Sequence, residues 1–229
     1  MEQVTIIIPV KDEEVGLRYL LENFQNSPLN GSSDIIFIFV IDERTSDKSK
    51  SIATKFSDVI IDQRDTKGKG AAIKQAVSVW KSQRTPYVVF LDADGSYSFE
   101  AVDSVIKTLK NGAEVVSGSR FMDNQGRPAG MSRLHNFGNR ALSMASSIRN
   151  RRRISDLCTG LWGFKSEALD SLEIKSNGFD IEAEIVGLSR KNGLKHVEIP
   201  VEWSQRKGGT SKLRSLTDGS IIFFRILRT

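Results

Sequence analysis

The chain has 229 residues, of which 39% are hydrophobic and 27% charged, with one cysteine and a formal net charge of +5. This length suits one large domain or two small ones, and the composition excludes a disordered chain and a disulfide-stabilised miniprotein. No run approaches the ~18 consecutive apolar residues that a membrane-spanning helix needs. The single cysteine, and a start of the sequence without a signal-peptide pattern, lead us to expect a cytoplasmic protein.

Short β-rich apolar runs alternate with helical patterns through the first half of the chain. Strands are predicted over Val4–Val10, Ile35–Ile41, Val59–Ile61, Tyr87–Leu91 and Glu114–Gly118. Helices are predicted between them, near residues 14–25, 47–56, 70–82 and 99–110. Continuous apolar strands are typical of parallel sheets that are covered on both faces. The alternation therefore predicts an α/β domain, a doubly wound and mostly parallel sheet flanked by helices.

The second half is less regular and more basic. Helices are predicted around 133–148 and 180–192, and a strand over 196–203. Between Arg120 and Lys165 there are nine Lys or Arg against two Asp or Glu, and from Arg206 to the end there are six against one. Such segments attract the phosphates of nucleotides, lipids or nucleic acids, and charge alone does not choose among them.

Acidic residues follow three of the predicted strands, at the sheet edge where doubly wound folds bind ligands. Asp92 and Asp94 alternate along an extended segment, so both carboxylates point the same way. Such a pair suits Mg²⁺ or Mn²⁺ held jointly with phosphates, although a simple turn at Asp94-Gly95-Ser96 also explains it. Glu13 follows the first strand, and Asp42, after the second, could accept hydrogen bonds from a base or ribose.

Glycine and basic residues supply the complementary positive groups. Gly68-Lys69-Gly70 opens a predicted helix, where glycines permit close backbone approach and the helix N-terminus favours an anion. Arg120, Arg133 and the basic loop 206–212 could bind phosphate, because arginine recognises it bidentately. A solvated surface is the alternative interpretation of these cations.

The last segment combines apolar residues with arginines. The apolar positions are Leu213, Leu216, Ile221, Ile222, Phe223, Phe224, Ile226 and Leu227, interspersed with Arg214, Arg225 and Arg228. A helix of this kind can lie against anionic lipid, or it can pack on the domain as an ordinary terminal helix. We predict a domain over residues 1–212 and an amphipathic juxtamembrane-type helix over 213–229.

The order of these motifs is more specific than any one of them. IIIPVKDEE, VIDERTSDKS, KGKGAA, FLDADGS, SGSRF, GFDIEAE and EIPVEWSQRKGGTSKL follow one another along nearly the whole chain. This series resembles the family 2 inverting glycosyltransferases of GT-A fold, a Rossmann-like architecture. It is most similar to the polyprenyl-phosphate (dolichyl-phosphate) hexosyltransferases, the mannose and glucose synthases.

The resemblance implies an activity, a location and partners. It implies metal-dependent, inverting transfer of a hexose from a nucleotide sugar to polyprenyl or dolichyl phosphate, with Mg²⁺ or Mn²⁺ as cofactor. Mannose from GDP-mannose is favoured, and glucose from UDP-glucose comes next. The enzyme would be peripheral at the cytoplasmic face of a membrane, and no nucleic acid would be a partner.

The resemblance also assigns roles to individual residues. It implies a nucleotide-sugar site lined by Pro9, Lys11, Glu13, Asp42, Lys69, Gly70, Asp92, Ala93, Asp94, Arg206, Ser211 and Lys212. Asp92 and Asp94 would bind the metal, and Ser96 stands where mannose synthases usually carry glutamine. Arg120 and Arg133 would receive the acceptor phosphate. Asp180 and Glu182 fall on the acceptor side, and with Asp94 and the two arginines they complete the expected catalytic set.

Three other functions remain open from the sequence. A family 2 enzyme that acts on a sugar hydroxyl would need Asp180 or Glu182 as a base, whereas a phosphate acceptor is already ionised and needs none. A nucleotidyltransferase would also use a metal aspartate, but would release pyrophosphate. A nucleic-acid-binding protein would use the RNRRR run at 149–153, with steep salt dependence, but would leave Asp92 and Asp94 unexplained.

Overall fold

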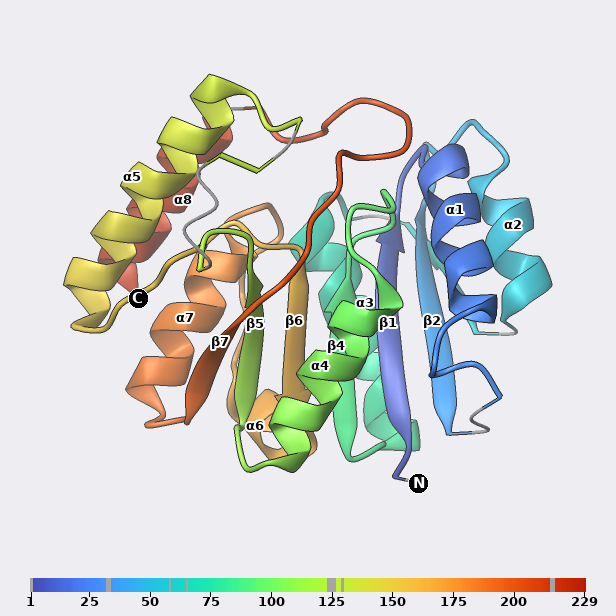
Figure 1. Cartoon of the computed structure of the whole chain (residues 1–229), viewed down its shortest axis with the longest axis horizontal. Coiled ribbons are helices and arrows are strands. Elements are labelled where there is room, and N and C mark those ends of the chain that lie inside the picture. Colours follow the sequence, from blue (N-terminus) through green and yellow to red (C-terminus); the bar gives the residue numbers. More distant parts are fainter. Residues whose placement is uncertain are drawn as a thin grey trace.

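The computed structural model describes residues 2–31, 34–57, 59–64, 66–122, 127–128, 130–214 and 217–229. A seven-stranded sheet forms its centre, in the order β3-β2-β1-β4-β6-β5-β7 (Figure 1). The strands are β1 Val4–Val10, β2 Ile35–Asp42, β3 Ile60–Gln63, β4 Tyr87–Leu91, β5 Val115–Ser119, β6 Leu161–Lys165 and β7 His196–Pro200. The predicted α/β class with a mostly parallel sheet is confirmed, and β6 alone among these strands runs antiparallel to its neighbours, between β4 and β5.

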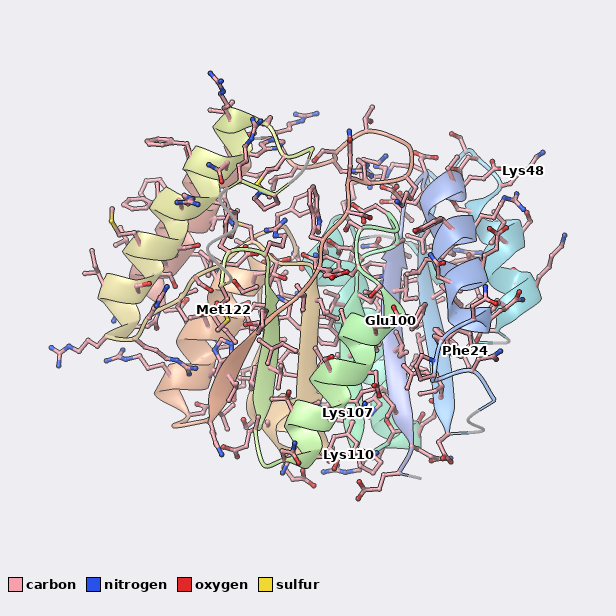
Figure 2. The ribbon with its side chains drawn as sticks, in the orientation of Figure 1. Phe24, Lys48, Glu100, Lys107, Lys110 and Met122 are labelled. Carbon is pink, nitrogen blue, oxygen red and sulfur yellow. The ribbon has the colours of Figure 1, made fainter. Side chains whose placement is uncertain are left out.

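Helices cover both faces of the sheet, as its continuous apolar strands predicted. They are α1 Glu14–Gln25, α2 Ser49–Phe56, α3 Lys69–Gln83, α4 Phe99–Lys110, α5 Arg133–Asn150, α6 Ser166–Ser171, α7 Ile181–Lys191 and α8 Thr217–Arg228. One buried cluster joins the sheet to α1, α2 and α4. In it Phe24, labelled in Figure 2, contacts Phe37 and Phe99 edge-on, with ring centroids 5.0 Å apart in both pairs. The other joins it to α3, α6, α7 and α8 around Trp80.

The register aligns the ends of the parallel strands. Val10 of β1 lies opposite Ile41 of β2, and Ile41 lies opposite Asp62 of β3. The residues that follow β1, β2 and β4 therefore meet at one edge of the sheet. The segment after β7 crosses this edge toward α1 before the chain reaches α8 (Figure 1). Within it, Lys207 N–H donates to Asp94 O at 3.0 Å. That crossing brings the basic loop over the acidic strand ends.

Helix α5 has its polarity reversed relative to an ordinary surface helix. Its buried residues are all polar: Asn139, Ser143, Ser146 and Asn150. Its exposed positions include large apolar side chains: Leu134, Phe137, Met144 and Ile148. Helix α8 lies beside it (Figure 1) and exposes Ile221, Phe223, Phe224 and Leu227, whereas Leu216 lies outside the described residues. The predicted C-terminal helix is present, and it packs on α5 and α7.

Candidate functional site

A cavity of about 1210 Å³ opens where the parallel strands end. Of the sixteen residues to which the family resemblance assigns a role, fourteen line it: Pro9, Lys11, Glu13, Asp42, Lys69, Asp92, Ala93, Asp94, Arg120, Asp180, Glu182, Arg206, Ser211 and Lys212. Gly70 and Arg133 are not among the described lining residues. The fold thus gathers side chains that lie up to about 200 positions apart in the sequence.

Asp42 ends β2 and is held by basic groups. Arg44 Nε donates to Asp42 Oδ1 at 2.7 Å, Arg44 Nη2 also contacts Oδ2, and Lys11 Nζ lies 3.9 Å from Oδ2. Burial alone would raise the pKa of Asp42, but the hydrogen bonds and charge of Arg44, with Lys11, outweigh it and hold the pKa below its usual value. Asp42 is therefore an ionised acceptor at the cavity wall. Arg44 was not singled out from the sequence.

Asp92 and Asp94 follow β4 and lie beside different cations. Lys69 Nζ lies 2.7 Å from Asp92 Oδ1 and 2.9 Å from Glu182 Oε1, so one lysine bridges two carboxylates. Burial would lower the pKa of Lys69, but Asp92 and Glu182 raise it well above its usual value, and the ammonium stays charged. Asp94 Oδ1 accepts from Ser96 N–H at 3.0 Å, and its Oδ2 lies 3.9 Å from Arg206 Nη1.

The start of α3 shows why two glycines stand there. A Cβ on Gly68 would lie 2.3 Å from Asn177 O, and one on Gly70 would lie 2.6 Å from Ser176 O. The expected close backbone approach occurs, but its partner is the 176–178 segment. Gly70 N–H donates to Gly178 O and Ala71 N–H to Asn177 O, so these donors are engaged by carbonyls and not directed at an anion. An anion at the start of α3, with Gly70 as part of the nucleotide-sugar site, stays a prediction that these two N–H groups do not support.

The basic loop after β7 closes the cavity over the first strand. Arg206 Nη2 donates to Glu13 Oε1 at 2.5 Å, and Lys212 Nζ lies 3.9 Å from the same oxygen. Burial raises the pKa of Glu13, and Arg206 and Lys212 oppose that shift only in part. Arg206 lies within 4 Å of both Glu13 and Asp94, and so connects two strand ends.

Arg120 is bound by an acidic partner that the sequence analysis missed. Its Nε and Nη2 donate to the two oxygens of Asp156 at 2.6 and 2.7 Å, and Nη2 also donates to Cys158 O. Asp156 is fully buried, and Asn139 completes its hydrogen bonding. Arg120 therefore reaches the cavity as one half of a buried ion pair. Its predicted contact with acceptor phosphate stays a prediction, as does that of Arg133, which is exposed at the start of α5.

Asp180 and Glu182 differ in what holds them. Asp180 Oδ2 accepts from Arg225 Nε at 2.7 Å, and its Oδ1 accepts from Ser176 Oγ. Burial would raise the pKa of Asp180, but these hydrogen bonds and the charge of Arg225 lower it below its usual value. Burial raises the pKa of Glu182, with Lys69 opposing. Both oxygens of Asp180 are engaged, which makes it a poor proton acceptor.

Comparison with known proteins decides the family. The model of Glycosyl transferase family 2 matches residues 5–172. The chain belongs to this family. It is a glycosyltransferase, and the fold class and family expected from the motif order are confirmed.

Named relatives of this family 2 chain cover most of its length. Glycosyltransferase AglJ of Haloferax volcanii is 28% identical over 228 residues, which are 99% of this chain and 72% of that protein. Dolichol-phosphate mannosyltransferase of Pyrococcus furiosus is 26% identical over 225 residues, 94% of this chain and 60% of that one. A crystal structure of glucosyl-3-phosphoglycerate synthase from Mycobacterium tuberculosis with Mn²⁺, UDP-glucose and phosphoglyceric acid matches 99% of this chain and 79% of that one. Its TM-score is 0.71 at 16% identity, a likeness of fold alone.

The cavity of this glycosyltransferase offers the type of ligand atom that a divalent cation binds. Asp92 and Asp94 both line the cavity and present carboxylate oxygens, the ligands that Mg²⁺ and Mn²⁺ prefer. Across the described ranges, no group of three or more His, Cys, Asp or Glu is placed to bind a metal. A cation held by this pair would take its further ligands from phosphates and water. Asp92 and Asp94 as metal ligands remain a prediction.

Proposed function

We propose that this family 2 glycosyltransferase transfers a hexose from a nucleotide sugar to a polyprenyl phosphate, with inversion at the anomeric carbon. GDP-mannose is the favoured donor and UDP-glucose the next, in keeping with the mannosyltransferase relative from Pyrococcus furiosus. The observation that carries the proposal is that one cavity is lined both by charged residues at the strand ends, called here its charged end, and by apolar residues of α5 and α8, called its apolar end.

The charged end suits the donor. Asp42 would accept hydrogen bonds from the base or ribose, because it is ionised and lies at the end of β2. Arg206 and Lys212 would bind the diphosphate from the loop above, and Asp92 and Asp94 would hold Mg²⁺ or Mn²⁺ beside it. The cation would neutralise charge that develops on the leaving nucleoside diphosphate. This part of the site would be completed by the remaining residues that the resemblance assigns to the donor: Pro9, Lys11, Glu13, Lys69, Gly70, Ala93 and Ser211.

The apolar end suits a lipid. Met131, Leu134 and Leu142 line it from α5 and the residues before it, and Ile221 and Ile222 line it from α8. Because Leu134 and Ile221 are also exposed, the cavity lining is continuous with the apolar surface of the two helices. A helix that buries asparagine and serine while exposing phenylalanine and isoleucine is suited to an apolar medium on its outer side. We infer peripheral binding of α5 and α8 to a membrane, the cytoplasmic face being the expected one.

No helix within the described residues is long and apolar enough to cross a membrane. Arginines accompany the apolar surface: Arg151 and Arg153 are exposed just beyond α5, and Arg149 in its last turn is half-buried. Cations at the edge of an apolar surface favour anionic lipid headgroups. This arrangement supports a site in which the acceptor phosphate enters from the membrane side.

The chemistry of a phosphate acceptor agrees with the state of Asp180. An ionised phosphate attacks the anomeric carbon without losing a proton, so one in-line displacement forms the new bond as the nucleoside diphosphate leaves. A hydroxyl acceptor would require a base, and Asp180 does not suit that role, because both of its oxygens are engaged and its pKa is lowered. Arg120 and Arg133 are the proposed phosphate-binding residues.

Paired acceptors test the proposal directly. A short polyprenyl phosphate and the matching polyprenol should be offered with the same donor and with Mn²⁺ or Mg²⁺. We expect sugar transfer to the phosphate and none to the alcohol. Transfer to a sugar or lipid hydroxyl, with none to the phosphate, would contradict the proposed acceptor while leaving the family assignment intact.

Substitution of Asp180 by asparagine separates the two acceptor classes. With lipid phosphate we expect kcat to fall by no more than about tenfold, because the side chain does not act as a base. The pH profile of the variant should have the same shape as that of the wild type. In both, activity would fall as the pH drops through ~6, where the acceptor phosphate becomes protonated. Loss of activity by roughly 10³-fold or more would instead mark Asp180 as an essential base.

A further inference from the structure

Arg225 of α8 turns inward, unlike the exposed apolar residues beside it. Its Nε donates to Asp180 Oδ2 at 2.7 Å and its Nη1 donates to Glu184 Oε1 at 3.2 Å. Both carboxylates are almost fully buried. In the part of the chain that the structure describes, Arg225 is the only cation within 4 Å of either. One guanidinium therefore neutralises two buried acids of the α7 start.

The remaining oxygens of the same two acids hold the preceding segment. Asp180 Oδ1 accepts from Ser176 Oγ. Glu184 Oε2 accepts from the backbone N–H of Lys175 at 3.0 Å and of Ser176 at 2.7 Å. Each carboxylate thus accepts hydrogen bonds from α8 with one oxygen and from residues 175–176 with the other. We call these groups, Arg225, Asp180, Glu184 and the 175–176 segment, the α8 clamp.

The segment held by the clamp forms part of the cavity wall. Beyond Ser176, the carbonyls of Asn177 and Gly178 accept from the first turn of α3, next to Lys69 and its partner Asp92. Gly178, Phe179 and Asp180 line the cavity. A shift of residues 175–180 would therefore move the wall that faces the acceptor side.

We propose that Arg225 is a positioning residue, which holds residues 175–180 in place through Asp180 and Glu184 and so shapes the acceptor side of the site. The effect on acceptor use rests on the proposed function, whereas the structural link does not. Without the guanidinium, the two buried carboxylates would have no neutralising cation, which is costly. Each would therefore move toward solvent and release its contacts to residues 175–176. Lysine could neutralise one of them but cannot bridge both, because it lacks the planar fork.

The test compares Arg225→Gln and Arg225→Lys with the wild-type full chain, with Arg84→Gln as the matched control. Arg84 Nη2 lies 2.7 Å from Asp170 Oδ2 and neither residue lines the cavity, so this control removes an arginine–aspartate pair elsewhere. Hydrogen exchange of residues 175–176 is measured without any substrate. Separately, the KM for polyprenyl phosphate in detergent and the dissociation constants of UDP and GDP with Mn²⁺ are measured.

In Arg225→Gln we expect exchange at residues 175–176 to be about tenfold faster and the KM for lipid phosphate about tenfold higher. Nucleotide affinity should stay within about twofold, and Arg225→Lys should be intermediate in exchange and KM. Arg84→Gln should match wild type throughout. If Arg225→Gln fails to fold, Arg225→Lys decides by the same comparison.

Unchanged exchange at 175–176 would overturn the clamp, whatever acceptor the wild-type chain uses. Faster exchange with unchanged acceptor kinetics would overturn the positioning role. Equal losses of nucleotide affinity and acceptor affinity would also overturn it, since they would show a general loosening of the domain. Because the exchange measurement needs no acceptor, it separates failure of the clamp from failure of the proposed function.

Discussion

Replacing Asp94 by asparagine is expected to lower kcat by about 10³-fold with Mn²⁺ or Mg²⁺ present. Asparagine keeps the Oδ1 that accepts from Ser96 N–H, so the turn after β4 should persist. It removes the negative charge that a divalent cation requires and that faces Arg206 at 3.9 Å. The loss should therefore appear in turnover and in Mn²⁺ affinity, and not in the melting temperature.

The matched control for this prediction is Asp103→Asn. Asp103 pairs with Lys107 on α4 and is not among the cavity residues, so the variant removes an equivalent charge elsewhere. We expect it to keep wild-type kinetics. Metal titrations followed by turnover, together with direct Mn²⁺ binding, make the comparison. Activity of Asp94→Asn within tenfold of wild type would contradict the metal assignment.

Replacing Arg120 by methionine is expected to destabilise the fold by about 3–5 kcal/mol. The substitution leaves Asp156 fully buried with no cation, and it removes the hydrogen bond to Cys158 O. Burial alone would lower the pKa of Arg120, but the charge and hydrogen bonds of Asp156 outweigh burial and raise it. Each partner of the pair therefore stabilises the charge of the other. Urea unfolding of the variant and the wild type gives the difference in free energy.

Arg133→Met is the comparison for that experiment. Arg133 is exposed at the first position of α5, and we expect its replacement to change stability by less than about 0.5 kcal/mol. If it does bind the acceptor, its loss should raise the KM for lipid phosphate alone. Equal stability of Arg120→Met and wild type would contradict the structural role of the Arg120–Asp156 pair.

Much of the fold could be predicted from the sequence because continuous apolar runs indicate strands that are buried on both faces. The bounds of β1 and β4 and of α1 and α4 agree with the predicted ranges. The antiparallel β6 was not predicted, since a five-residue apolar run carries no sign of its direction. The predicted strand over 196–203 ends at Pro200 as β7, where the chain leaves the sheet to cross the cavity.

The candidate site was predictable only where its residues follow strands or belong to recognisable motifs. Asp42, Asp92 and Asp94 were found in this way. Asp156 was missed because its partner Arg120 lies 36 positions away, and no local pattern connects the two. The inward contact of Arg225 was missed because arginines in an amphipathic helix are ordinarily solvated.

The glycines at the start of α3 show a related limit. Gly68 and Gly70 were correctly read as a place of close approach, but the approaching group is a carbonyl-bearing segment more than 100 positions later in the chain. The same pattern fits a phosphate equally well, since both bring an oxygen to backbone N–H groups. A sequence pattern can thus predict where backbone N–H groups are accessible, but not which oxygen they bind.

Release of nucleoside diphosphate tests the central claim most directly. A panel of GDP- and UDP-sugars should be incubated with the chain and Mn²⁺ or Mg²⁺, with and without polyprenyl phosphate. The proposed function predicts release from one donor that depends on the lipid phosphate, which would identify the sugar and the acceptor together. Release that is indifferent to the lipid phosphate, or none from any donor, would contradict it.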